Sequence, residues 1–177
     1  MAVEIVFETH STTEDNEAGR ATGWNQGRLS PAGRDNAAAL GRRRREDRLD
    51  VVLISDLARA EETAAIAFGG SAVRILKDWR LRECDYGELN GAPVDQVHDR
   101  AAFLHTPYPG GESWCDATTR VAGVLPDIAA RWDGGRVLVI GHVATRWGLE
   151  IALGGARLED LAVADFAWQE GWEFRLG

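Results

Sequence analysis

Two histidines and an arginine follow three separate apolar runs of the chain. His10 comes shortly after the first run, Arg59 follows the second and His142 follows the third. The runs are Ile5–Phe7, Val51–Ile54 and Val137–Ile140. If the runs are parallel strands, these side chains meet at the edge where the carboxyl ends lie. One imidazole could then attack phosphorus, while the other and the guanidinium stabilise the phosphoryl oxygens. The sequence therefore predicts phosphoryl transfer.

Such a reaction also needs a proton for the leaving oxygen, and a partly buried carboxylic acid can supply it. Glu83 is the candidate because it lies in a non-periodic stretch, residues 81–87, after a further apolar run. Asp85 and Glu88 lie close by in the sequence, so a solvated role for Glu83 stays open.

The rest of the pattern indicates an α/β architecture. Strands are expected at 5–7, 51–54, 73–76 and 137–140, and helices at 31–40, 59–68, 94–104, 115–132 and 144–153. Residues 166–168 and 172–174, around Gly171, predict a terminal hairpin. Strands that are apolar throughout and alternate with helices favour a largely parallel sheet covered on both faces. Residues 8–28 are too long for a simple connector and form a candidate binding loop.

Composition excludes several functional classes. The chain has 177 residues and a net charge of −8, which disfavours a nucleic-acid partner. No apolar run has the roughly 18–20 residues that span a bilayer, and no export signal precedes the first strand. The two cysteines are too few for a disulfide framework. We expect one domain over residues 1–177, a cytoplasmic location, no membrane partner, and a terminal hairpin whose edge could pair in a homodimer.

Six motifs spread over nearly the whole chain carry a more specific signal. They are H-S-T-T-E-D-N at 10–16, T-G-W at 22–24 with L-S-P-A-G at 29–33, S-D-L-A-R-A-E-E-T-A at 55–64, R-E-C-D-Y-G at 82–87, P-G-G-E-S at 109–113 and G-H at 141–142. In residue types, spacing and order they resemble the motifs of the histidine phosphatase superfamily, in its phosphoglycerate mutase-like branch. The resemblance implies a three-layer α/β/α sandwich with a mixed, mainly parallel sheet.

The resemblance also implies roles for individual residues. His10 would be the nucleophile, Glu83 the proton donor, and Arg59 and His142 the groups that hold the phosphoryl group. Further candidates for phosphate or substrate contacts are Thr9, Ser11, Thr13, Asn16, Arg20, Thr22, Gly23, Arg82 and Arg146. The expected activity is hydrolysis of a small phosphorylated metabolite through phosphohistidine. No metal or cofactor is expected, because cationic side chains take the role that a metal would play.

Two positions depart from the family pattern. The family's arginine before the nucleophile is Thr9 here, and the glycine after it is Ser11. Loss of a bidentate guanidinium could cost about 2–4 kcal/mol of transition-state stabilisation, and a hydroxyl returns only one neutral hydrogen bond. Arg20, Arg82 and Arg146 are candidates to supply the missing charge. Arg146 is favoured because it lies near the start of a predicted helix, where N–H groups attract anions.

Other interpretations stay open. Mutase activity is the runner-up, which the T-G-W motif favours, although the chain looks short beside the mutases. Thr9 keeps a third alternative in view, a non-catalytic protein that binds a phosphorylated ligand. Arg59 could form only a surface ion pair with Glu61 or Glu62, and Thr13, Asn16 and Thr22 could only stabilise a loop. The run Arg42–Arg45 is interpreted as a solvated face near a helix end.

Overall fold

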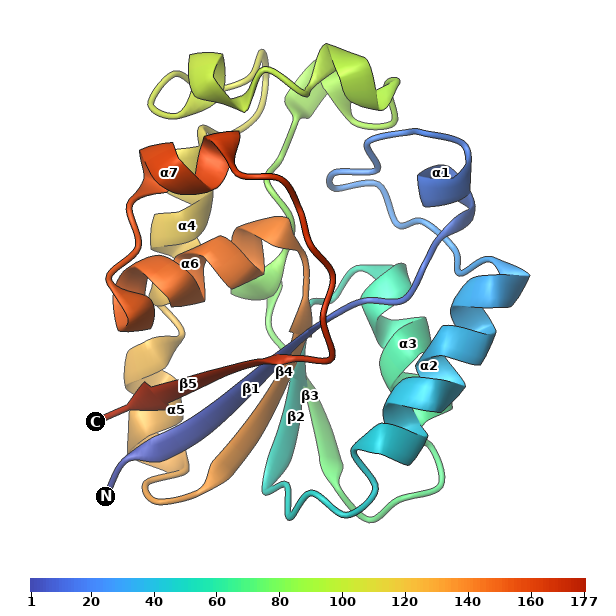
Figure 1. Ribbon diagram of the computed structural model, residues 1–177, viewed down its shortest axis with the longest axis vertical. Coiled ribbons are helices and arrows are strands. Elements are labelled where there is room, and N and C mark those ends of the chain that lie inside the picture. The colour runs from blue at the N-terminus through green and yellow to red at the C-terminus, as the bar shows by residue number, and fades with distance from the viewer.

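A five-stranded sheet between two layers of helices forms the centre of the molecule (Figure 1). The structure is a computed structural model that describes residues 1–177. The strands are β1 (Val3–Thr9), β2 (Val51–Ile54), β3 (Arg74–Lys77), β4 (Arg136–Gly141) and β5 (Trp172–Leu176). Their order is β3-β2-β4-β1-β5, and only β5 runs antiparallel to its neighbour. The predicted mixed, mainly parallel sheet is confirmed.

Helices cover both faces of this sheet (Figure 1). Helices α2 (Pro31–Arg43) and α3 (Ala58–Phe68) cover one face, and α4 (Trp114–Ala122), α5 (Leu125–Arg131) and α6 (Val143–Gly154) cover the other. Two short helices, α1 (Glu14–Glu17) and α7 (Leu158–Val163), complete the set. The predicted α/β/α sandwich is therefore confirmed. Helix α2 begins as its sequence predicts, with the Ser30 hydroxyl accepting from the Gly33 N–H and Pro31 in the first turn.

Alternating side chains of the central strands fill two separate cores. On β1, Ile5 and Phe7 pack toward α5, while Val6 packs toward α2. Successive side chains of a strand point to opposite faces, so a strand that is apolar throughout fits only a sheet buried on both sides. A third cluster, which includes Tyr108 and Trp114, lies under residues 84–108 beside the carboxyl ends of the strands.

Two predicted helices differ in the structure. Residues 94–104 form only the 3₁₀ turns η3 (Val94–Gln96) and η4 (Arg100–Phe103). Neither turn has a side-chain cap, and the backbone between them leaves helical geometry at Asp99. The predicted helix 115–132 is instead α4 and α5, separated at Gly123 and Val124. Pro126 explains this break, because its ring clashes with the carbonyl four residues earlier.

The predicted terminal hairpin is wrong. Only β5 is a strand, and it pairs with the edge of β1, with Ile5 opposite Phe174. Residues 164–170 form no strand and run along the outside after α7, which the sequence did not reveal. Pairing with a second copy through a hairpin edge stays a prediction, but the hairpin on which it was based does not form.

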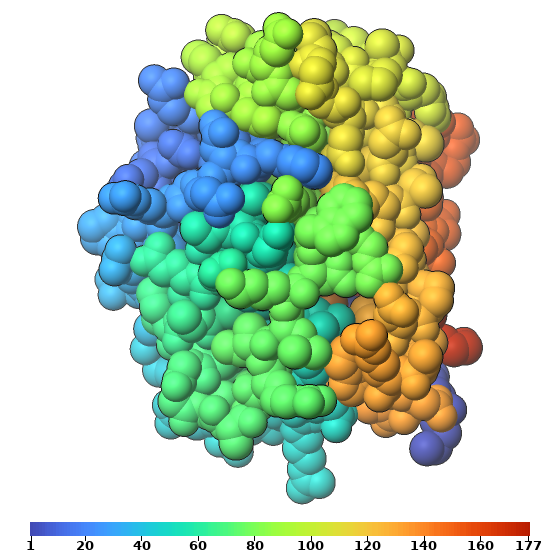
Figure 2. All heavy atoms as spheres, turned by 180° about the vertical axis from the view of Figure 1, so that it is seen from behind, coloured from blue at the N-terminus to red at the C-terminus, as the bar shows by residue number.

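Residues 85–112 lie over the carboxyl ends of the strands. From behind, this yellow-green segment forms the top of the molecule (Figure 2). Its only helical elements are the short 3₁₀ turns η2 (Gly87–Leu89), η3 and η4.

None of the helices has the length and apolar character needed to cross a bilayer.

Candidate active site

His10 and His142 meet where β1 and β4 end side by side. The register pairs Thr9 with Gly141, and the His10 N–H donates to the Gly141 carbonyl at 2.9 Å. The ring centres of the two histidines are consequently 5.0 Å apart. Gly141 is needed there, because a Cβ at this position would lie 2.3 Å from the Thr145 hydroxyl oxygen.

Arg59 joins the two imidazoles. Its Nε donates to His10 Nε2 at 3.3 Å, and its Nη2 lies 3.2 Å from His142 Nδ1. The guanidinium is buried and also donates to the carbonyl oxygens of Asn25 and Gly23, each at 2.8 Å. The structure thus brings together the three residues that the sequence predicted to converge. Arg59 forms no ion pair with Glu61 or Glu62, which pair with Lys77 and Arg34.

Both imidazoles are neutral near pH 7. Burial and the Arg59 cation lower the pKa of His10 to about 3, although its hydrogen bond to the Ser11 carbonyl opposes the shift. Burial, Arg59 and His10 likewise hold the pKa of His142 well below its usual value. The Nδ1 atom of His10 lies 2.8 Å from the Ser11 oxygen, so Nδ1 carries the proton and Nε2 keeps a lone pair.

The second imidazole presents an unused donor. His142 Nδ1 faces the guanidinium and therefore accepts, which leaves the proton on Nε2. Nε2 is buried and has no hydrogen-bond partner. A buried polar group is nearly always paired, so this N–H is free to bind a ligand oxygen.

Glu83 lies at the amino end of α6. Its Oε1 accepts from the N–H groups of Cys84 at 3.0 Å and Ala144 at 2.9 Å, and its Oε2 accepts from Val143 at 3.3 Å. The side chain is buried and lines the same cavities as His10. The carboxylate is therefore held in place by backbone groups at the carboxyl edge of the sheet.

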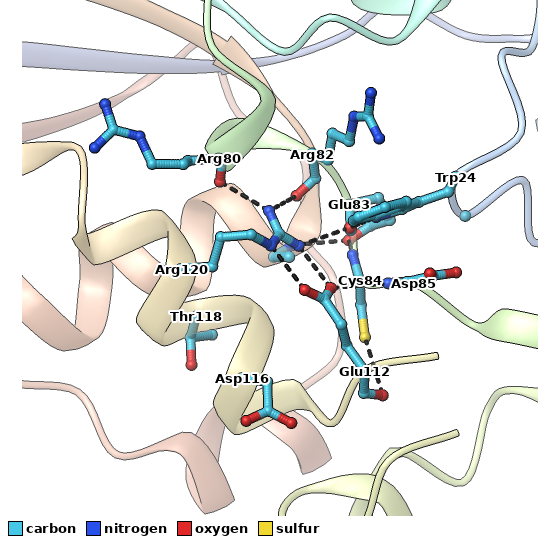
Figure 3. Close-up of polar contacts among 12 residues, drawn as sticks. Trp24, Arg80, Arg82, Glu83, Cys84, Asp85, Glu112, Asp116, Thr118 and Arg120 are labelled. Atoms are coloured by element: carbon cyan, nitrogen blue, oxygen red, sulfur yellow. Dashed lines mark hydrogen bonds and ion pairs between the residues drawn. The ribbon is translucent and has the colours of Figure 1, made fainter. Parts of the chain in front are cut away.

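A second arginine holds the loop that carries Glu83. Arg120 donates to the carbonyl oxygens of Arg80, Arg82 and Glu83 and pairs with Glu112 at 2.7 Å (Figure 3). The indole of Trp24 donates to the same Glu83 carbonyl at 2.7 Å. The P-G-G-E-S motif thus contributes Glu112 to the positioning of Glu83, a role that the sequence did not reveal.

Two cavities meet at these residues. The smaller, of about 130 Å³, includes Arg59, Thr22 and Gly23 in its lining, and has room for about four water-sized groups, taking roughly 30 Å³ for each. The larger, of about 690 Å³, continues past Thr9 and Ser11. Four residues line both cavities: His10, Asn16, Glu83 and Arg100.

The other predicted ligand contacts divide into two groups. Arg20 lines the small cavity and donates to the Gly91 carbonyl at 3.0 Å. Thr13 and Arg82 line neither cavity. Thr13 is fully buried and caps α1 by bonding to Asn16, so its hydroxyl is already used. Arg82 is held away by Asp56, with two hydrogen bonds of 2.7 Å.

Arg146 does not replace the missing arginine. It lines neither cavity, and its Nε lies 3.4 Å from Glu150. Its guanidinium packs over the rings of Phe166 and Trp172, 5.3 and 5.4 Å from their centres. A residue four positions after His142 lies one helical turn further on, and at that place it faces the C-terminal segment.

Two features near the site were missed by the sequence analysis. Arg100 lines both cavities, but it belongs to the segment wrongly predicted as a helix and carries no motif. Glu8 is buried and binds Arg43 and Arg44, so half of the Arg42–Arg45 run is not a solvated face. The sequence signal for these ion pairs was weak: a glutamate directly after the first apolar run and a run of arginines elsewhere in the chain.

Comparison with known proteins agrees with this geometry. The family model for the histidine phosphatase superfamily (branch 1) matches residues 5–166. The chain belongs to the histidine phosphatase superfamily. Members of this superfamily related to the chain are named both as mutases and as phosphatases.

Individual relatives show how far the similarity extends. The 2,3-bisphosphoglycerate-dependent phosphoglycerate mutase of Methylobacterium radiotolerans is 34% identical, with 90% of this chain and 84% of the relative covered. Phosphoserine phosphatase 1 of Hydrogenobacter thermophilus is 28% identical over 88% of this chain and 78% of its own. Bacillus stearothermophilus YhfR has a similar structure, with a TM-score of 0.84 and 29% identity over 95% of this chain and 88% of that chain.

Proposed function

We propose that this superfamily member hydrolyses a small phosphate monoester through a phosphohistidine on His10. One observation carries the proposal: Arg59 binds both imidazoles, and the buried Nε2–H of His142 has no partner. A phosphoryl group beside His10 would supply oxygens for the His142 donor and for the guanidinium. Charge that develops on these oxygens in the transition state would be stabilised by donors that are already in place.

In the first step, the lone pair of His10 Nε2 attacks phosphorus and the bond from phosphorus to the ester oxygen breaks. In the free protein Arg59 donates to this lone pair, so substrate must displace that donor toward the phosphoryl oxygens. The neutral state of His10, which follows from its lowered pKa, keeps the lone pair available. The product of this step is phosphohistidine and an alcohol.

Glu83 moves the proton in both steps. To protonate the leaving oxygen, Glu83 must carry a proton, which a singly protonated phosphate ester brings into the site. Glu83 then passes this proton to the leaving oxygen. In the second step its carboxylate takes a proton from water, the water oxygen bonds to phosphorus, and the bond to His10 Nε2 breaks. The proton then leaves Glu83 with the product, as dihydrogen phosphate.

Arg100 is the side chain that best fills the place left by Thr9. Three arginines line the small cavity: Arg20, Arg59 and Arg100. Of these three, Arg100 is the one that also lines the large cavity. Its guanidinium packs 5.4 Å from the ring centre of Trp147, so part of its conformational freedom is already lost. A guanidinium here would add a second cation for the phosphoryl oxygens.

Mutase activity is the second candidate, because the 34% identical relative bears that name. A mutase must keep water from phosphohistidine until a second phosphorylated molecule accepts the group. The large cavity, which reaches from His10 to the exposed Trp168, gives water a route to the intermediate. We therefore favour hydrolysis.

Phosphate release from a panel of small phosphate monoesters tests the proposal. The wild type, His10→Ala and a matched control, His105→Ala, are compared; His105 is exposed and lies outside both cavities. We expect turnover by the wild type and the control, and a loss of at least about 1,000-fold in His10→Ala, as for other nucleophile deletions. Binding without phosphate release would indicate a non-catalytic protein, and transfer only to added phosphoglycerate would indicate a mutase.

A further inference from the structure

The large cavity extends well beyond the reacting groups. From His10 and Glu83 it passes Thr9 and continues between α2 and residues 166–170. Its volume of about 690 Å³ lies in the range of cavities that bind small organic molecules, roughly 300–1,000 Å³. The two cavities meet at His10, Asn16, Glu83 and Arg100, which line both of them. A ligand whose phosphoryl group lies beside His10, where the two cavities meet, could therefore extend into this groove.

Two aromatic side chains form the outer wall of the groove. Phe166 and Trp168 both line it, and they are 49% and 58% exposed. Both lie on the irregular segment where the sequence had predicted a strand. Large aromatic side chains gain free energy when they are removed from water, so two such rings facing one cavity favour an apolar occupant.

Arginine side chains contact the two rings and the segment that carries them. Arg146 packs over Phe166, and the Cζ atom of Arg43 lies 5.9 Å from the ring centre of Trp168. Arg44 donates to the Glu170 carbonyl at 3.0 Å, which ties the segment to α2. These contacts with three arginines hold the aromatic wall in place, so the surface is preformed.

Buried Glu8 orients two of these arginines. Its carboxylate accepts from Arg43 at 2.9 and 3.2 Å and from Arg44 at 2.9 Å, and only 1% of the residue is exposed. The bidentate contact fixes the Arg43 guanidinium, which also lines the groove. The Arg43 guanidinium and the Trp168 indole thus border the same space.

We propose that the groove binds an aromatic ring of the substrate, attached through a short linker to the ester oxygen. The inference rests on the proposed function, because it places the phosphoryl group beside His10. A planar ring stacks on Phe and Trp and on a guanidinium, whereas a saturated ring of the same size has no quadrupole to interact with them. The substrate class is therefore phosphate monoesters of aryl-substituted alcohols.

Two esters of matched size and leaving-group acidity test this proposal. We compare kcat/KM for 2-phenylethyl phosphate and 2-cyclohexylethyl phosphate, because a plain aryl ester would react faster through its better leaving group. Stacking predicts a preference of about fivefold to tenfold for the phenyl ester, mainly through a lower KM.

Three variants locate the source of the preference. We expect Trp168→Ala and Phe166→Ala to reduce the ratio of the two kcat/KM values toward one, and Trp168→Phe to keep part of it. Trp79→Ala is the matched control, because Trp79 is 53% exposed but lines neither cavity. The control should keep the wild-type ratio, and circular dichroism should show that each variant is folded.

The outcomes separate this inference from the proposed function. Equal kcat/KM for the two esters, or a ratio that survives both alanine variants, would overturn the groove assignment while leaving hydrolysis intact. If neither ester is hydrolysed although other phosphate monoesters are, the groove assignment is overturned. If no phosphate monoester is hydrolysed, the proposed function fails, and the groove is tested by the Kd values of the matching 2-phenylethyl and 2-cyclohexylethyl phosphonates. Tighter binding of the phenyl compound that is lost in Trp168→Ala would support the groove, and equal Kd values would overturn it.

Discussion

Thr9 determines how the charge of the site is distributed. With a hydroxyl at this position, positive charge beside His10 comes from Arg59 on α3 and from Arg100 on the segment above the sheet. Arg59 also donates to backbone carbonyls through hydrogen bonds of 2.8 Å, so part of its hydrogen-bonding capacity is already used. Phosphate affinity should therefore depend strongly on Arg100.

Arg100→Ala should weaken inhibition by inorganic phosphate by about 10- to 100-fold, since hydrogen bonds to charged groups contribute roughly 1.5–3 kcal/mol. Adding Thr9→Arg to this variant should restore most of the loss, because residue 9 precedes His10 and lines the large cavity with it, so that the new side chain would bring a guanidinium to the same site. The inhibition constant of phosphate measures both effects. Exposed Arg74 on β3 provides the control, and Arg74→Ala should leave the constant unchanged. An unchanged constant in Arg100→Ala would exclude the role given to Arg100.

At this scale the sequence predicts strand-end residues well and loop residues poorly. His10, Arg59 and His142 could be placed together because apolar runs fix where parallel strands end. Arg100 could not, because the path of residues 85–112 depends on contacts with Tyr108 and Trp114 that no local pattern reveals. Arg146 was correctly predicted to lie on the helix after His142. The sequence could not predict where its guanidinium points, because this depends on contacts with Phe166 and with Trp172 of β5.

The loop formed by residues 19–27 also holds the Arg59 guanidinium. Gly23 has a φ of +54°, and its carbonyl accepts from Arg59. A Cβ at Gly23 would lie 1.9 Å from the Asn90 side-chain oxygen, which itself accepts from the Trp24 and Tyr86 N–H groups. This glycine therefore links the loop, the segment above the sheet and the guanidinium.

Gly23→Ala should lower kcat/KM by at least about tenfold, because the loop must shift and the Gly23 carbonyl with it. Gly19→Ala is a control with similar backbone strain, since Gly19 has a φ of +65° and no atom within 4 Å of an added Cβ. The control should lose about 1–2 kcal/mol of unfolding free energy but keep its activity. Equal activity losses in the two variants would show that the Asn90 contact has no special role.

Among the helices and strands, those with local sequence signals were also predicted better than those that depend on contacts with distant parts of the chain. Strands and capped helices, such as α2 after Ser30, were predicted because their signals are local. The break between α4 and α5 was missed although Pro126 signals it, and β5 was predicted as half of a hairpin because its partner, β1, is far away in the sequence.

For the whole molecule, neutral buried histidines link stability to pH. In the unfolded chain both imidazoles titrate near pH 6.5, whereas in the native state the pKa of His10 is about 3 and that of His142 is also well below its usual value. Below pH 6.5 the unfolded state therefore binds more protons than the native state. The stabilisation is fully present above this pH and is lost as the pH falls toward the native values.

We expect the free energy of unfolding to decrease below pH 6.5, with each such imidazole contributing about 1.4 kcal/mol per pH unit. His142→Asn, which keeps a residue suited to the N-cap of α6, should reduce this slope by about one proton. Denaturant unfolding at pH 4.5–7.5 measures the slope, and exposed His105→Ala should not change it. Identical slopes for His142→Asn and the wild type would contradict a neutral buried His142.

The covalent step on His10 is the central claim, and trapping it is the most direct test. The protein is mixed with excess phosphate ester, quenched in base within milliseconds and analysed by mass spectrometry of its peptides. We predict an acid-labile phosphoryl group on His10, which forms before steady-state turnover, decays in water without an acceptor and is absent from His10→Ala. Turnover of the ester with no phosphoryl group on His10 at any time would contradict the account.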